Sequence, residues 1–143
     1  MTHLGLGATI GLLGGNEDTV KAIQGALGKE IAEIELRKGE DYEDYYDALC
    51  LTFVDETKII IFDDGQSCGE ERYMTTDDDL QYFVGATFLD TEIAEAPDVE
   101  GDSEVHEVQF LNIKTSKGVF TMETHNRHNG WYGGFLIRAK EIK

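Results

Sequence analysis

Short runs of apolar residues, many of them alternating with polar residues and separated by turn-forming residues, dominate the chain. This pattern is typical of β-strands with one or both faces buried. The expected strands are EIAEIEL (30–36), ALCLTFV (48–54), KIIIF (58–62), ATFLDTEI (86–93), VHEVQFLNIK (105–114) and VFTME (119–123), with shorter runs RYM (72–74) and FLIRA (135–139). Turns join consecutive runs into hairpins, and hairpin strands pair antiparallel.

Two short helices are expected, each directly before a strand. The first begins after Asn16, a good N-cap, and ends at Gly28. The second begins after Thr76, with three aspartates at 77–79 in its first turn, and ends at Gly85. Helices this short and few cannot cover both faces of a parallel sheet. The sequence therefore predicts an α+β fold with a mainly antiparallel β-sheet and two short helices.

Residues 16–74 and 76–141 show the same order of elements, namely helix, strand, acidic connection, hairpin and polar loop. Gly28 and Gly85 end the two helices at corresponding positions. Any two hairpin units share part of this pattern, so an internal duplication within a single domain of residues 1–143 is a hypothesis. It predicts pseudo-symmetric halves whose polar loops occupy equivalent positions and face one cleft.

The composition is that of a globular protein, since 41% of the 143 residues are hydrophobic, 10% aromatic and 29% charged. One domain with its own core is expected from these values. The longest apolar stretch, residues 4–13, is too short to span a bilayer and lacks the basic flank of a signal peptide, which predicts a soluble cytoplasmic protein. Cys50 and Cys68 are expected to be free thiols, because a single bridge is not the pattern of a disulfide scaffold.

The formal net charge of −17 is unevenly distributed, with eleven Asp or Glu residues and no Lys or Arg between Arg72 and Lys114. Such a surface repels nucleic acid and anionic membranes, so direct binding of either is not expected. The simplest interpretation is a solubilising surface. The alternatives are a docking site for a basic protein surface, or a set of carboxylates that imitates a phosphate backbone.

Two polar loops carry the residue types from which a site could be built, and loops held by strands are the usual location of functional residues. The loop DDGQSCGEE supplies carboxylates, an amide and a thiol, and the loop THNRHNGWYGG supplies imidazoles, amides and aromatic rings. The candidate ligand-binding residues are Asp63, Asp64, Gln66, Cys68, Arg72, His125, Asn126, His128, Asn129, Trp131 and Tyr132.

Three functional interpretations compete with the interpretation that these loops are only well-formed turns. A divalent metal would use His125, His128 and Asp64, although the sequence has no HExxH, paired CxxC or EF-hand pattern and establishes no cofactor. Nucleophilic catalysis would use Cys68 or Ser67, activated by His125 or His128, with an aspartate at 63 or 64 to orient the imidazole. A pocket for a small molecule or nucleotide would use amides and imidazoles for hydrogen bonds, Arg72 for an anionic group and aromatic rings for stacking.

The strings FDDGQSCGEERYMTTDDDL (62–80), HEVQFLNIKTSKGVF (106–120) and HNRHNGWYGGF (125–135) resemble a family of uncharacterised proteins from bacteriophages and bacteria. The resemblance extends from about residue 28 to the end of the chain. It implies a small phage-associated α+β domain without an assigned activity. Family members often have two adjacent cysteines in the first loop, whereas here Gly69 follows Cys68, so a two-thiolate metal site is not expected.

The phage context implied by the resemblance favours a non-catalytic binding protein of phage or prophage origin. Such a protein would bind a host protein or sequester a small ligand, with counter-defence as a specific role, and neither action needs turnover. The alternative is a metal- or thiol-dependent hydrolase that uses the loops at 63–71 and 125–134.

Overall fold

A computed structural model describes residues 17–39, 47–64, 71–95, 99–100, 105–128 and 134–142. Strands make up most of these residues, with one α-helix and one 3-10 turn. The elements are α2 (Glu17–Ala26), β1 (Ile31–Arg37), β2 (Ala48–Phe53), β3 (Lys58–Asp63), β4 (Glu71–Thr75), η1 (Leu80–Phe83), β5 (Phe88–Glu95), β6 (Val99–Glu100), β7 (Val105–Thr115), β8 (Gly118–His128) and β9 (Ile137–Ile142). All the strands expected from the apolar runs are present.

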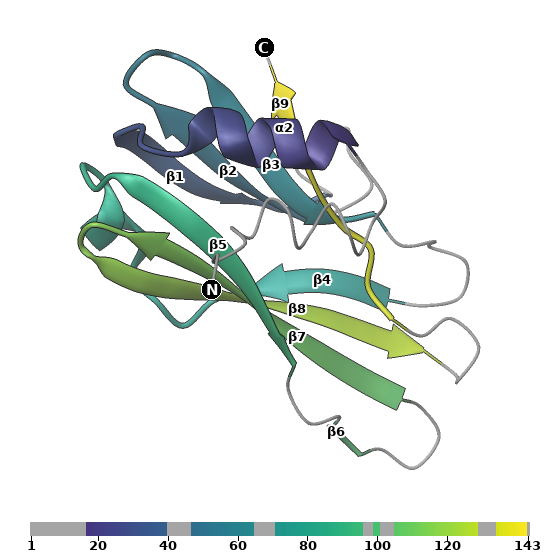
Figure 1. Cartoon of the computed structure of the whole chain (residues 1–143). Coiled ribbons are helices and arrows are strands. Elements are labelled where there is room, and N and C mark those ends of the chain that lie inside the picture. The colour runs from purple at the N-terminus through teal and green to yellow at the C-terminus, as the bar shows by residue number, and fades with distance from the viewer. Residues whose placement is uncertain are drawn as a thin grey trace, which may run out of the picture.

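The strands form two antiparallel sheets, which lie one above the other in Figure 1. The first sheet has the order β1-β2-β3-β9, and the second has the order β4-β8-β7-β5, with the short β6 paired to β7. Every pairing is antiparallel. The prediction of a mainly antiparallel α+β fold is therefore confirmed.

One edge strand of each sheet comes from the part of the chain that otherwise forms the other sheet. Strand β4 follows β3 in sequence but pairs with β8 of the second sheet, and β9 follows β8 but pairs with β3 of the first sheet. The two segments therefore cross between the sheets in opposite directions. The covalent chain therefore joins the two sheets at both crossings, and each crossing strand is hydrogen-bonded in the sheet that it enters.

A second connection joins the sheets where β1 and β5 begin, around an antiparallel bridge between Glu30 and Thr87. Four backbone hydrogen bonds of 2.8 to 2.9 Å surround this bridge. Their N–H groups donate from Gly28 to Phe88, from Phe88 to Lys29, from Gly85 to Ile31 and from Ile31 to Ala86. If residues 28–31 and 85–88 are interchanged position by position, each of these four hydrogen bonds maps onto another of the four. An internal duplication would produce such a pattern, but the duplication itself stays a prediction.

Large apolar side chains from both sheets fill the space between them, and Phe53, Phe88 and Phe120 are among the largest that are fully buried. Helix α2 contributes Ile23 to this core and packs along β9. The Thr19 hydroxyl accepts a hydrogen bond of 3.2 Å from the backbone N–H of Ala139, so the helix also satisfies an edge group of β9.

A smaller apolar cluster lies on the other face of the first sheet and contains Cys50 and Phe62. Cys50 is a free, buried thiol, as predicted, and burial raises its pKa. Cys68 lies outside the described residues. No helix in the part of the chain that the structure describes is long and apolar enough to cross a membrane.

The prediction of a second α-helix beginning after Thr76 is wrong. Only the four-residue 3-10 turn η1 forms, and its N-cap is Asp79, whose carboxylate accepts a hydrogen bond from the N–H of Gln81. The hydroxyl of Thr76 accepts a hydrogen bond of 3.1 Å from the N–H of Asp78 and donates to the carbonyl of Thr121 on β8, at 2.7 Å. Thr76 is therefore bound to the sheet. The two residues of η1 that pack against the core, Leu80 and Phe83, are three positions apart, and a 3-10 turn places such residues on the same side. The first helix is confirmed from Glu17 onward.

Gly28 and Gly85 generate a stability prediction, because both have positive φ angles, of 84° and 92°, in addition to their hydrogen bonds across the sheets. An alanine at either position should lower the free energy of unfolding by about 1 kcal/mol or more, since a Cβ disfavours this backbone conformation. Chemical denaturation followed by circular dichroism measures the effect.

Gly25, one turn earlier inside α2, is the matched control, because an added Cβ there meets nothing within 4 Å. Gly25→Ala should raise the free energy of unfolding by up to about 1 kcal/mol. Equal effects of the alanine at positions 25 and 28 would contradict the backbone explanation.

Candidate functional site

A buried ion pair lies where the two crossing segments meet. Asp63 ends β3 and Arg72 lies at the start of β4, and the guanidinium NH1 is 2.7 Å from Asp63 Oδ2. The two side chains are only 5% and 10% exposed. Charges this deeply buried are stable only when they are paired and hydrogen-bonded.

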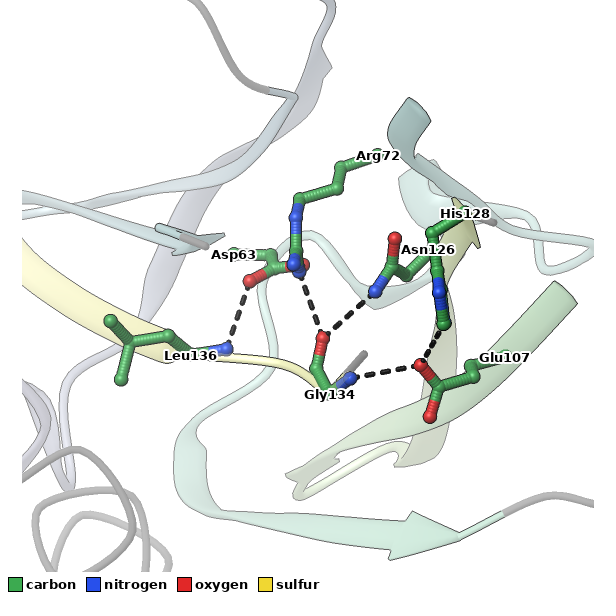
Figure 2. Close-up of polar contacts among 7 residues, drawn as sticks. All are labelled: Asp63, Arg72, Glu107, Asn126, His128, Gly134 and Leu136. Atoms are coloured by element: carbon green, nitrogen blue, oxygen red, sulfur yellow. Dashed lines mark hydrogen bonds and ion pairs between the residues drawn. The ribbon is translucent and has the colours of Figure 1, made fainter. Parts of the chain in front are cut away.

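Gly134, just before β9, connects this ion pair to the inner face of the second sheet (Figure 2). Its carbonyl accepts hydrogen bonds from Arg72 at 2.9 Å and from the Asn126 side-chain amide at 3.1 Å. Its N–H donates to a Glu107 carboxylate oxygen at 2.8 Å, and His128 Nε2 is 2.7 Å from the same oxygen. These contacts link residues on β4, β7 and β8 to the chain that enters β9.

The other Asp63 oxygen, Oδ1, accepts a hydrogen bond of 2.9 Å from the backbone N–H of Leu136. Asp63 therefore contacts both the outgoing segment, through Arg72, and the returning segment, through Leu136. We refer to the connected groups as the crossing network, which comprises Asp63, Arg72, Glu107, Asn126, His128, Gly134 and the Leu136 backbone.

The crossing network contains several of the predicted site residues, but these residues do not line an open cleft. Asp63, Asn126 and His128 are buried, with exposed fractions of 6%, 0% and 6%. A cavity of about 10 Å³ borders the Asp63–Arg72 pair and is lined in part by Thr124. This volume accommodates one water molecule and no larger ligand. The main role that the geometry gives these side chains is to hold the two crossings together.

Asp64 and His125 are not part of the network. Asp64 forms an ion pair with Arg138 at 3.0 Å, with both side chains about one third exposed or more. His125 points to the outer face of the second sheet, because side chains alternate between faces along β8 and Asn126 points inward. His125 and His128 therefore lie on opposite faces and cannot bind one metal ion together with Asp64.

Five predicted site residues lie outside the described part of the chain, namely Gln66, Cys68, Asn129, Trp131 and Tyr132. Ligand binding by the loops stays a prediction. Within the residues that are described, no group of three or more His, Cys, Asp or Glu side chains is arranged to hold a metal ion.

Sequence reasoning missed Glu107 and Gly134. Glu107 has a signal in the alternation of β7, because it lies two and four residues before Gln109 and Leu111 and therefore on the core face of the strand. A carboxylate facing a core predicts a buried polar partner. Gly134 has a φ of 87°, but several glycines precede β9 and the sequence does not distinguish them.

The outer face of the second sheet carries a histidine pair, His106 on β7 and His125 on β8, which sequence reasoning did not identify. The His106 Nε2 and His125 Nδ1 atoms are 2.9 Å apart. Tyr73 on β4 stacks on the His125 ring with a centroid distance of 4.4 Å and an interplanar angle of 8°. On its other side, His125 Nε2 is 2.9 Å from Thr75 Oγ1.

The pKa of His125 is lowered, mainly because burial penalises the charged imidazole and also because His106 lies next to it. Lys38 lowers the pKa further, and the carboxylate of Glu123 opposes these effects. Folding therefore favours the neutral form of His125 relative to the unfolded chain.

A wider depression of about 280 Å³ lies between α2 and β9, away from the predicted loops. Its lining combines both signs of charge, from Asp18, Lys21, Lys140 and Glu141. Polar groups of this kind are typical of a solvated surface, whereas small-molecule sites are usually apolar and concave.

The fold and the crossing network define a small protein of two antiparallel sheets with exchanged strands and, among the residues that the structure describes, one α-helix. Residues 24–137 match the family model described as a domain of unknown function, DUF7448, and the chain belongs to that family. No curated protein and no solved structure matches the chain.

The crossing network generates a prediction about Arg72. Arg72→Met should lower the free energy of unfolding by about 3 to 5 kcal/mol, because it leaves the Asp63 carboxylate buried without its cation. Adding Asp63→Asn should restore part of this loss, which a double-mutant cycle in urea measures.

Arg138→Met is the matched control, since it breaks the neighbouring but more exposed pair with Asp64 and should cost about 0 to 1 kcal/mol. An effect of Arg72→Met no larger than that of Arg138→Met would show that the buried pair does not hold the fold.

The lowered pKa of His125 predicts a pH dependence. The folded state holds a proton on His125 less readily than the unfolded state, so this contribution to stability is complete above the ordinary histidine pKa of about 6.5 and is lost as the pH falls below it. As the pH falls from about 7.5 to about 5.5, the wild type should therefore lose stability relative to His125→Gln. Urea denaturation of both proteins in a chelating buffer measures this difference. A difference that does not change with pH would contradict the lowered pKa.

Proposed function

We propose that this protein is a non-catalytic binding protein that engages a basic protein through an acidic surface next to η1. This docking surface comprises Asp77, Asp78, Asp79, Tyr82 and Val119. The three carboxylates are exposed, and Tyr82 and Val119 are 60% and 52% exposed. The observation that carries the proposal is this combination of three exposed carboxylates with large exposed apolar side chains.

Contacts to the β7–β8 hairpin bring these residues to one region of the surface. The Asp78 carboxylate accepts a hydrogen bond of 2.7 Å from the N–H of Thr121 on β8. Lys117 in the hairpin turn places its ammonium 5.8 Å from the centre of the Tyr82 ring. Val119 lies between Lys117 and Thr121 in the sequence.

The chemistry of this surface favours a protein partner. Tyrosine is enriched at protein interfaces, where its ring buries a large area at a small entropic cost. The carboxylates would accelerate association with a basic surface and select against acidic ones. A net charge of −17 extends the attraction beyond the contact area.

The crossing network supports a non-catalytic role. Asp63 is paired with Arg72, and His128 is bound to Glu107, so the described carboxylate and imidazole that were candidates for catalysis already hold the fold. The alternative, a metal- or thiol-dependent hydrolase, would depend on the loop residues at 65–70 and 129–133. Sequestration of a small ligand by those same loops is a further alternative.

The phage or prophage origin that the sequence resemblance implies would make the partner a protein of the bacterial host, met in the host cytoplasm. A basic surface that normally binds nucleic acid fits a carboxylate-rich partner of this kind. Counter-defence is the biological role that follows when the blocked protein belongs to host defence.

An affinity experiment with charge-matched variants tests the proposal. The wild-type chain is immobilised and exposed to a bacterial cell extract, and retained proteins are identified by mass spectrometry across increasing salt. We expect retained proteins to be basic and to be released between low and moderate salt, because exposed charges are screened over about 8 to 10 Å at ordinary ionic strength. The triple variant Asp77→Asn, Asp78→Asn and Asp79→Asn should lose them.

The control is a second triple variant, Glu17→Gln, Asp18→Asn and Glu56→Gln, which removes the same charge from exposed positions on α2 and the β2–β3 turn. It should retain the same proteins as the wild type. Equal losses in both triple variants would indicate non-specific charge attraction, and salt-insensitive retention would contradict an electrostatic interface.

A further inference from the structure

The histidine pair on the outer face of the second sheet is not part of the crossing network or of the docking surface. His106 and His125 occupy neighbouring strands, and their facing nitrogens, Nε2 and Nδ1, are 2.9 Å apart. The Tyr73 hydroxyl lies 3.5 Å from His106 Nε2 on the same side of the sheet. Three atoms that can donate electron pairs therefore meet at one half-buried position.

The hydrogen bonds beyond the pair determine which nitrogen of His125 carries its proton. A carboxylate only accepts hydrogen bonds, so the Thr75 hydroxyl must donate to Glu123 Oε2, at 3.2 Å. The same hydroxyl oxygen then accepts from His125 Nε2–H at 2.9 Å. His125 Nδ1 is left with its lone pair directed at His106.

This chain of a carboxylate, a hydroxyl and an imidazole is the arrangement that orients histidine ligands of metal ions. In such sites the nitrogen that does not bind the metal donates to an acceptor, which fixes the tautomer and makes the other nitrogen a better ligand. Tyr73 adds a second restraint, because its ring stacks on His125.

We propose that His106 Nε2 and His125 Nδ1 together bind one divalent transition-metal ion, with water and the Tyr73 hydroxyl beside the remaining positions. Metal–imidazole bonds of about 2.0 to 2.1 Å allow two nitrogens 2.9 Å apart to bind one ion at an angle of about 90°. Binding requires His106 to move its proton from Nε2 to Nδ1 through solvent, so no net proton is lost. Both rings must also turn, because each lone pair then points toward the ion, about 45° away from the line that joins the two nitrogens.

The angle indicates which ions fit. An angle near 90° is that of neighbouring ligands in square-planar or octahedral coordination, which Ni²⁺ and Cu²⁺ adopt with nitrogen and oxygen ligands. Tetrahedral zinc would need the two nitrogens about 3.3 Å apart. Ni²⁺ and Cu²⁺ also lie at the high-affinity end of the divalent series. The strongly negative chain raises the local concentration of any cation.

Nickel titration of the full chain tests the site without oxidising its thiols. The sample for titration is prepared without a polyhistidine tag. Every sample also carries His3→Gln, because a histidine at position 3 can bind Ni²⁺ together with the amine and amides that precede it. Calorimetry at about pH 7.5, where imidazoles are largely neutral, should then show one Ni²⁺ per chain. His106→Gln and His125→Gln should each weaken binding at least about 10-fold.

Two further variants separate a metal site from a structural contact. Thr75→Val keeps both imidazoles but removes the acceptor of His125 Nε2–H, and it should weaken binding by about 10-fold. Asp64→Asn removes a more exposed carboxylate outside the crossing network and should leave the affinity unchanged. Equal affinity in the His106, His125 and parent samples would overturn the proposal, as would no binding up to about 1 mM Ni²⁺.

The metal proposal and the proposed function fail independently. Loss of protein binding in the triple aspartate variant does not involve His106 or His125, and the nickel titration does not involve the docking surface. A chain that binds Ni²⁺ but retains no basic protein would therefore contradict only the proposed function.

Discussion

The buried ion pair between Asp63 and Arg72 is the interaction on which the topology depends. Two unlike charges in a low-dielectric interior stabilise each other only when each remains in place, and here each is carried by a different sheet. Gly134 and Leu136 connect the returning segment to the same pair. The exchange of β4 and β9 between the sheets is therefore held by one network, and a fault in it would affect both crossings.

This use of polar groups limits where function is located. The inner face of β8 carries a histidine and an amide that resemble catalytic residues in the sequence. The Asn126 amide binds the Gly134 carbonyl, and His128 binds Glu107, which in turn accepts the N–H of Gly134. Two accessible features of the described residues differ in kind: carboxylates with exposed apolar side chains near η1, and a histidine pair on the outer face of the second sheet. We propose a basic protein as the partner of the first surface and a divalent cation as the ligand of the second.

Much of the fold could be predicted from local patterns, because strands and hairpins are encoded by alternation and turns. The ends of the 17–26 helix were likewise readable from its cap region and Gly28. The crossings could not be predicted, since the five residues of β4 carry no information about whether β3 or β8 is their partner. The prediction of a second helix was wrong: Thr76 accepts the N–H of Asp78 as a cap residue would, but its hydroxyl is also bound to β8, and only the 3-10 turn at 80–83 follows.

The candidate site was predicted in part. Alternation along β8 already separates His125 from Asn126 and His128, so the sequence contained the signal that one cleft could not hold all three. The pairing of His125 with His106 depends on the register of β7 and β8, in which Val108 lies opposite His125 and His106 lies opposite Arg127. That register is set by the length of the hairpin turn, which the local residue types did not establish.

Native-state hydrogen exchange of Arg72→Met tests most directly the claim that one network holds both crossings. The backbone amides of β4 and β9 should exchange faster together in this variant, while those of β1 and β2 change less, and Arg138→Met should leave both crossings protected. Faster exchange of β4 with unchanged protection of β9 would show that the two crossings are held independently, and would contradict the account.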